Sequence, residues 1–155
     1  MSPVDTDTLR VERTYDAPPE AVFDAWTNPE VLRRWWKTSD AGSVPVADVD
    51  LRVGGGYRLS MLDAEGEDHT VFGEYREVER PHRLVYSWTW EGTGPTAGHE
   101  SLVVVTFNQE GDGTDARTTV VIEHSNFMST TSREAHGHGW AGALDSLARE
   151  VFPTR

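Results

Sequence analysis

The stretch TSREAHGHGWAGALDSLAREVF, residues 131–152, decides the fold of this chain. Thr131 followed three residues later by Glu134 is typical of a capping box at a helix start. Pro153 is typical of a helix end, because proline has no N–H and clashes with the preceding turn. Between these signals, one helical face about 80° wide, at about 100° per residue, collects the bulky side chains. The sequence therefore predicts a long amphipathic helix whose buried face carries His136, Trp140, Leu144, Leu147 and Val151.

The segments before this helix predict a sheet that receives its buried face. Two short helices are expected after the first strand, one starting at Pro18 and Pro19, the other capped by Asn28 with Pro29 at its first position. Short turns rich in Gly, Pro and Asp separate the later strands and favour antiparallel hairpins. The prediction is an α+β fold in which a curved antiparallel sheet of six to seven strands wraps around the long C-terminal helix. Alternation places the strands at residues 9–15, 46–52, 56–62, 70–79, 83–90, 101–109 and 117–124.

Composition limits the classes of protein that fit. The 155 residues, 37% of them hydrophobic, predict one domain, 1–155, with one core. A net charge of -12 argues against nucleic acid and anionic membranes as partners. The chain has no cysteine, and its first residues have neither a basic start nor an apolar run, so no export signal is expected. We therefore expect a cytoplasmic protein without disulfides or cysteine-based metal sites.

The histidines do not predict a metal centre. His136 and His138 are two positions apart and point roughly 160° from each other on a helix, so they cannot share an ion within that helix. His124 and His136 are candidates either for polar groups in a pocket or for buried imidazoles with internal hydrogen-bond partners. VGGGYR lacks the Lys-Ser/Thr of a phosphate loop, and no nucleophile motif is present. We expect no metal and no cofactor.

Two Gly-rich segments have open interpretations. EGTGPTAGHE, residues 91–100, is long for a hairpin loop and is either a mobile cover over a pocket mouth or an idle surface loop. Gly137, Gly139 and Gly142 lower the helix propensity of the last helix by about 1 kcal/mol each relative to alanine. They either permit a close approach of helix and sheet or leave room beside Trp140 for a ligand.

Several motifs together resemble the activator of Hsp-ninety ATPase homologue-like family, a branch of the START-like (SRPBCC) superfamily. These are APPEAVFDAWTNPEVLRRWW, VGGGYRL, FGEYREVERPHRLVYSW and the C-terminal HGHGWAGALDSL, in that order over nearly the whole chain. The resemblance implies a helix-grip fold with a cavity between sheet and helix. It leaves function open, because superfamily members bind lipids, hormones and polyketides, catalyse cyclisations or assist a chaperone.

The leading hypothesis is that the cavity binds a small apolar or aromatic molecule. Six tryptophans are many for one small domain, and the predicted inward faces are rich in aromatic rings. The alternatives are a polyketide cyclase/dehydratase-like enzyme with a buried acid–base histidine, and a chaperone ATPase activator-like domain that binds protein. We expect a monomer or a homodimer. The candidate ligand-binding residues are Trp35, Trp36, Tyr57, Phe72, Tyr86, Trp88, Trp90, Phe107, His124, His136 and Trp140.

Overall fold

A computed structural model describes residues 8–38, 41–92, 94 and 97–153 of the chain. Residues 1–7, in which no export signal was expected, lie outside the described part. The described elements follow the predicted order, with one short 3-10 turn added before the last strand. They are β1 (Leu9–Tyr15), α1 (Pro19–Thr27), α2 (Pro29–Trp35), β2 (Ser43–Val49), β3 (Gly56–Leu62), β4 (Asp68–Glu79), β5 (Arg83–Trp90), β6 (Glu100–Glu110), η1 (Gly113–Asp115), β7 (Arg117–Ser125) and α3 (Thr130–Glu150).

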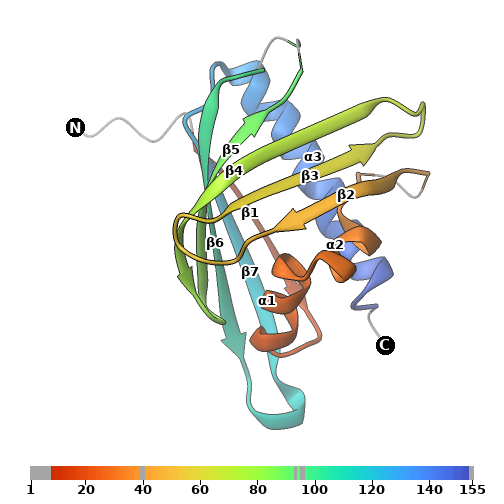
Figure 1. Cartoon of the computed structure of the whole chain (residues 1–155). Coiled ribbons are helices and arrows are strands. Elements are labelled where there is room, and N and C mark those ends of the chain that lie inside the picture. The colour runs from red at the N-terminus through yellow and green to blue at the C-terminus, as the bar shows by residue number, and fades with distance from the viewer. Residues whose placement is uncertain (1–7, 39–40, 93, 95–96, 154–155) are drawn as a thin grey trace.

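The strands form one antiparallel sheet in the order β1-β7-β6-β5-β4-β3-β2. Strands β2 to β7 are a meander in which each strand pairs with the next, and β1 pairs with β7. Figure 1 shows the sheet curling around α3, with α1 and α2 on the same side of the sheet as α3. The predicted α+β fold, a curved sheet around a long C-terminal helix, is confirmed.

Six strands match their predicted bounds to within two residues, but β2 begins and ends three residues earlier than predicted. The reason is a tight turn that starts directly after it. Arg52 N–H donates to the carbonyl oxygen of Asp50 at 2.9 Å, and Gly54 has a φ of 86°. A Cβ on Gly55 would overlap the Asp50 carbonyl, so this turn depends on glycine. Pro45 is tolerated because β2 is an edge strand.

Helix α3 has the predicted buried face and a different N-cap. Ser129 caps it, and the hydroxyl of Ser129 accepts the N–H of Ser132 at 3.1 Å. The predicted capping box at Thr131 is therefore wrong, because the helix already begins at Thr130. Trp140, Leu144 and Leu147 are buried as predicted, whereas His136 and Val151 are half-buried. The helix ends at Glu150, three residues before Pro153, with Val151 as its C-cap.

Helix α2 positions two neighbouring tryptophans. As predicted, Asn28 is its N-cap, with the side-chain oxygen accepting the N–H of Glu30 at 3.0 Å, and Pro29 is its first residue. Trp35 closes the helix inside the core, where its indole N–H donates to the carbonyl of Ala25 at 2.9 Å. Trp36, the C-cap, follows it out of the helix toward α3.

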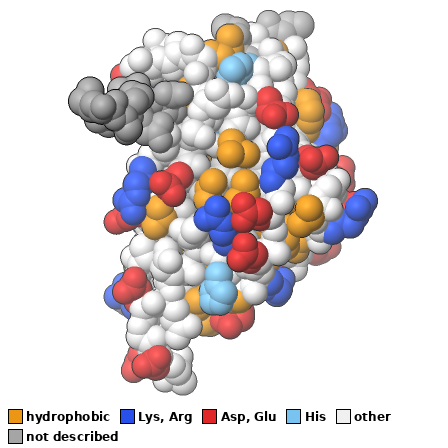
Figure 2. All heavy atoms as spheres, turned by 90° about the vertical axis from the view of Figure 1, so that its left-hand side faces the viewer, with side chains coloured by type: hydrophobic (Ala, Val, Ile, Leu, Met, Phe, Trp, Pro, Cys, Tyr) orange, Lys and Arg blue, Asp and Glu red, His pale blue; other side chains and the backbone are white. Residues whose placement is uncertain are grey.

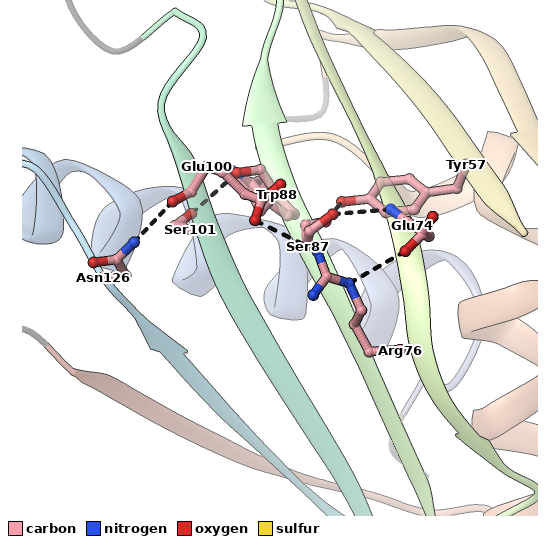
Figure 3. A network of polar contacts seen from close by, with 8 residues as sticks. All are labelled: Tyr57, Glu74, Arg76, Ser87, Trp88, Glu100, Ser101 and Asn126. Atoms are coloured by element: carbon pink, nitrogen blue, oxygen red, sulfur yellow. Dashed lines mark hydrogen bonds and ion pairs between the residues drawn. The ribbon is translucent and has the colours of Figure 1, made fainter. Parts of the chain in front are cut away.

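The outer surface of the sheet mixes apolar and charged side chains, as Figure 2 shows. Arg76 of β4 lies between two carboxylates there, with Nε 3.4 Å from Glu74 and Nη2 3.5 Å from Glu100 of β6 (Figure 3). Phe72 is 40% exposed, because it lies on the same face of β4 as Glu74 and Arg76, at every second residue of the strand. Its predicted place among the inward aromatic residues is therefore corrected.

Candidate functional site

A cavity of about 670 Å³ lies between α3 and the ends of β3, β4 and β5. Its apolar wall is formed chiefly by Trp36, Met61, Trp88, Trp90, Trp140 and Ala143. Polar side chains gather along its other surfaces, among them Lys37, Asp63, Asp68, His69, Thr70 and Ser132. A concave apolar surface with a few polar groups has the composition of a small-molecule site.

Five of the eleven predicted site residues line this cavity, namely Trp36, Trp88, Trp90, His136 and Trp140. Phe72 lies on the outer face, and the other five are buried elsewhere. Trp35, Tyr57, Tyr86 and Phe107 pack in the core, and His124 is fully buried behind the wall, in contact with Trp140. The cavity therefore occupies one end of the inward-facing aromatic set.

Three tryptophans form a continuous part of the wall. Trp36 lies 5.8 Å from Trp88 and 5.6 Å from Trp140, and Trp88 lies 5.2 Å from Trp140, measured between ring centroids. These separations are those of rings in direct contact, so the three side chains support one another. They come from the C-cap of α2, from β5 and from α3, which means that the wall joins all three elements.

His136 is held in one neutral form by two hydrogen bonds. Its Nδ1 lies 2.8 Å from the carbonyl of Ser132, which can only accept, so Nδ1 carries the proton. Its Nε2 then accepts the indole N–H of Trp90 at 2.8 Å. Burial lowers the pKa of His136, which favours the same neutral form.

His124 is held in the opposite tautomer. Its Nδ1 accepts the indole N–H of Trp140 at 3.1 Å. The hydroxyl of Ser101 donates to the carbonyl of Trp88 at 3.2 Å, as Figure 3 shows, so the His124 Nε2–H donates to that hydroxyl at 2.8 Å. Burial, assisted by nearby His136, lowers the pKa of His124 well below its usual value.

Both histidines therefore use both ring nitrogens inside the protein. Neither has a lone pair or an N–H left for a bound molecule while these hydrogen bonds persist. His124 is therefore a buried imidazole with internal partners, whereas His136 has internal partners but is half-buried and lines the cavity. Their role is to fix Trp90 and Trp140 in the wall, since each accepts the indole N–H of one of them.

A carboxylate–imidazole pair in the cavity lining was missed by the sequence analysis. Asp63 follows β3, and its Oδ2 lies 2.9 Å from Nε2 of His69 at the start of β4. The other oxygen of Asp63 accepts the backbone N–H groups of Glu65 and Glu67, both at 2.9 Å. The hydrogen bond from His69, followed by these backbone donors, lowers the pKa of Asp63. The only sequence signal is an Asp at a turn start and a His six residues later.

Glu67 brings a third donor atom close to this pair. Ligand atoms of Asp63, Glu67 and His69 lie within 4.8 Å of one another, a spacing that a metal ion could use. Both oxygens of Asp63 already accept hydrogen bonds, and His69 uses Nε2 to reach one of them. A metal on Nε2 of His69 would break the bond to Asp63, and both oxygens of Asp63 are already engaged, so these contacts are those of a hydrogen-bonded turn.

The glycines of α3 show both of the predicted roles. A Cβ on Gly142 would lie 2.7 Å from the carbonyl oxygen of Thr38, so this glycine permits close packing. A Cβ on Gly139 would meet no atom within 4 Å, and Gly139 lines the cavity. Gly139 therefore leaves room beside Trp140.

The 91–100 segment borders the cavity through Glu91, Gly92, Gly94 and Ala97. Residues 93, 95 and 96 lie outside the described part, so the predicted mobile cover stays a prediction.

A curved antiparallel sheet that grips a C-terminal helix defines the START-like class, a fold family known for binding hydrophobic ligands. The sequence profile described as "Activator of Hsp90 ATPase homolog 1-like protein" matches residues 16–151, and the chain belongs to that family. The resemblance found in the sequence is thereby confirmed. None of the described helices is both long and apolar enough to cross a membrane.

Solved structures agree with this assignment. A protein from Chromobacterium violaceum is 26% identical, with 96% of this chain and 99% of that one covered and a TM-score of 0.76. A protein from Silicibacter pomeroyi that carries the family's name is 26% identical, with coverages of 93% and 96% and a TM-score of 0.79. An HSP90 activator from Plasmodium falciparum is 24% identical, with coverages of 96% and 99% and a TM-score of 0.71, and shares the fold. No protein of curated function matches the chain.

Proposed function

We propose that this protein binds a small apolar or aromatic molecule in the cavity beneath α3. The observation that carries the proposal is the 670 Å³ cavity whose wall contains four tryptophans. A ligand that hides about 300 Å² of apolar surface gains about 7 kcal/mol before other terms, at about 25 cal/mol per Å². Association and ordering remove part of this gain, which leads us to expect dissociation constants in the micromolar range.

The polar groups that orient such a ligand differ from those expected from the sequence. His124 and Tyr86 lie outside the cavity lining, and the ring nitrogens of His136 are already hydrogen-bonded. The indole N–H of Trp88 is buried without an acceptor among the described residues. This nitrogen has no exposed surface, so a ligand oxygen would reach it only if the ring of Trp88 turned toward the cavity.

The alternatives have weaker support. A cyclase or dehydratase that uses His124 or His136 as its acid–base group would need a ring nitrogen that is free of internal hydrogen bonds. Both nitrogens of each residue are already bonded. A chaperone-activating role is stated for the Plasmodium falciparum protein, whose likeness supports the fold alone. We also propose that residues 1–155 form a single domain, that the protein is cytoplasmic, and that it is a monomer or a homodimer.

Titration with N-phenyl-1-naphthylamine, a neutral apolar fluorophore, tests the proposal. The wild-type protein should bind it with saturation and enhance its fluorescence. Gly139→Leu should weaken binding at least about 10-fold, which corresponds to about 1.4 kcal/mol, because the new side chain enters the open space of the cavity. Ala141→Leu is the matched control, since Ala141 is exposed on the same helix and lies outside the cavity lining. Equal affinities for both variants and wild type would place the fluorophore elsewhere and refute the proposal.

A further inference from the structure

The Asp63–His69 pair differs from His124 and His136 in having one ring nitrogen without a hydrogen-bond partner. His69 uses Nε2 to contact Asp63. Its Nδ1 has no hydrogen-bond partner among the described residues, whereas His124 and His136 have partners on both nitrogens. His69 lines the cavity, and its side chain is 42% exposed. It is therefore a histidine of the cavity lining that retains a ring nitrogen for a bound molecule.

Asp63 determines which ring nitrogen of His69 stays without a partner. The Asp63 carboxylate is a pure acceptor, so it holds the proton of neutral His69 on Nε2 and leaves the lone pair on Nδ1. The two backbone donors, Glu65 and Glu67, fix the other oxygen and thus the orientation of the carboxylate. A carboxylate that sets the tautomer and orientation of an imidazole is the arrangement that makes histidine a general base.

We propose that Asp63 and His69 form a proton-transfer site, in which His69 Nδ1 removes a proton from a neutral, flat molecule held against the tryptophan wall. This proposal rests on the ligand binding proposed above. The substrate class is a molecule with an acidic C–H or O–H whose electrons move into an adjacent acceptor group. His69 gains the proton, the bond electrons stay on the substrate, and the resulting imidazolium returns its proton to water at the exposed mouth. Asp63 is a positioning residue, because it acts through His69.

The elimination of 5-nitrobenzisoxazole is a suitable test, because it needs a single base and an aromatic binding surface. The base takes the proton on C3, the C–H electrons form the nitrile, the N–O bond breaks, and 2-cyano-4-nitrophenolate is released and measured by absorbance. His69→Gln should lower kcat/KM at least about 10-fold, since a positioned general base contributes about 100-fold or more. The glutamine amide can still donate a hydrogen bond to Asp63, so the turn is preserved.

Asp63→Asn separates positioning from structure. Its remaining Oδ1 can keep both backbone donors, but its new amide donates to His69 Nε2 and moves the proton to Nδ1. We expect a loss in kcat/KM similar to that of His69→Gln, at least about 10-fold. Nitrogen-15 NMR of the imidazole should show the Nε2–H tautomer in wild type and the Nδ1–H tautomer in Asp63→Asn. His138→Gln is the control, because His138 is exposed on α3 and lies outside the cavity lining.

The outcomes separate this proposal from ligand binding itself. If 5-nitrobenzisoxazole displaces N-phenyl-1-naphthylamine but His69→Gln turns it over as fast as wild type, the proton-transfer proposal is overturned and ligand binding stands. If neither molecule binds to wild type, both proposals fail. A rate that EDTA abolishes and Zn²⁺ restores would assign Asp63, Glu67 and His69 to a metal and also overturn the proton-transfer role.

Discussion

Replacing His124 by phenylalanine tests whether this histidine is a structural hub behind the cavity. His124 is fully buried, and the substitution removes both of its hydrogen bonds while keeping an aromatic ring. The indole N–H of Trp140, itself 3% exposed, loses its acceptor. An orphaned buried donor costs about 1–3 kcal/mol. The hydroxyl of Ser101 keeps its bond to the Trp88 carbonyl and adds little.

The larger phenyl ring adds a packing cost of about 1–3 kcal/mol, so His124→Phe should lower the free energy of unfolding by about 2–6 kcal/mol. Urea denaturation followed by far-ultraviolet circular dichroism at pH 8 measures this, because both states then carry neutral histidine. The exposed substitution His138→Phe should change stability by less than about 0.5 kcal/mol.

A double-mutant cycle isolates the hydrogen bond from the packing term. Trp140→Phe leaves His124 Nδ1 without its donor, and the double variant removes both partners, so the second substitution should cost less than it does alone. We expect a coupling energy of about 1–2 kcal/mol. Additivity of the two single substitutions within about 0.5 kcal/mol, or a loss below about 0.5 kcal/mol for His124→Phe, would refute the hub role.

Three further predictions concern pH and glycines. The pKa values of His124 and His136 are lower in the folded than in the unfolded protein, so their stabilisation is complete above the unfolded value of 6.5 and falls on acidification below it. The free energy of unfolding should fall by up to about 1.4 kcal/mol per pH unit for each proton taken up on unfolding. Urea titrations from pH 8 to 5 measure this dependence, and a free energy of unfolding that does not change with pH would contradict it. His124→Phe should reduce the dependence. Gly73→Ala should cost at least about 2 kcal/mol in urea unfolding, because its Cβ would overlap the Ser87 carbonyl; a neutral effect would contradict that contact. Gly139→Ala should stabilise by up to about 1 kcal/mol through helix propensity, whereas Gly142→Ala should destabilise the protein because of its 2.7 Å approach to Thr38; equal melting temperatures would argue against the distinction.

Local patterns predict most of this fold because they report local geometry. Alternation matches the buried residues of β3, β6 and β7, and the helical period matches the buried residues of α3. The differences arise where a turn or a helix cap sets the end of an element. β2 ends early because a turn at Asp50 needs Gly54 and Gly55, and α3 starts early because Ser129 offers the cap.

The candidate site was predicted less well, because alternation gives a face but no position along it. Tyr86 and Trp88 share the inward face of β5, yet Tyr86 accepts the indole N–H of Trp26 under α1 while Trp88 lines the cavity. Phe72 was included for its aromatic ring against the alternation of its own strand. His69 was missed because its contact with Asp63 depends on the β3–β4 register, which brings residue 69 opposite Met61.

The chemical role of the three histidines near the cavity depends on whether their ring nitrogens already have hydrogen-bond partners, more than on their distance from the cavity. A proton taken by His136 would displace the N–H of Trp90 and create a charge in a site whose burial already lowers the pKa of that imidazole. A proton taken by His69 Nδ1 displaces nothing, lies next to the Asp63 carboxylate and can pass to water. Base chemistry in this cavity is therefore expected at the more exposed His69, while His124 and His136 hold the tryptophans of the wall in place.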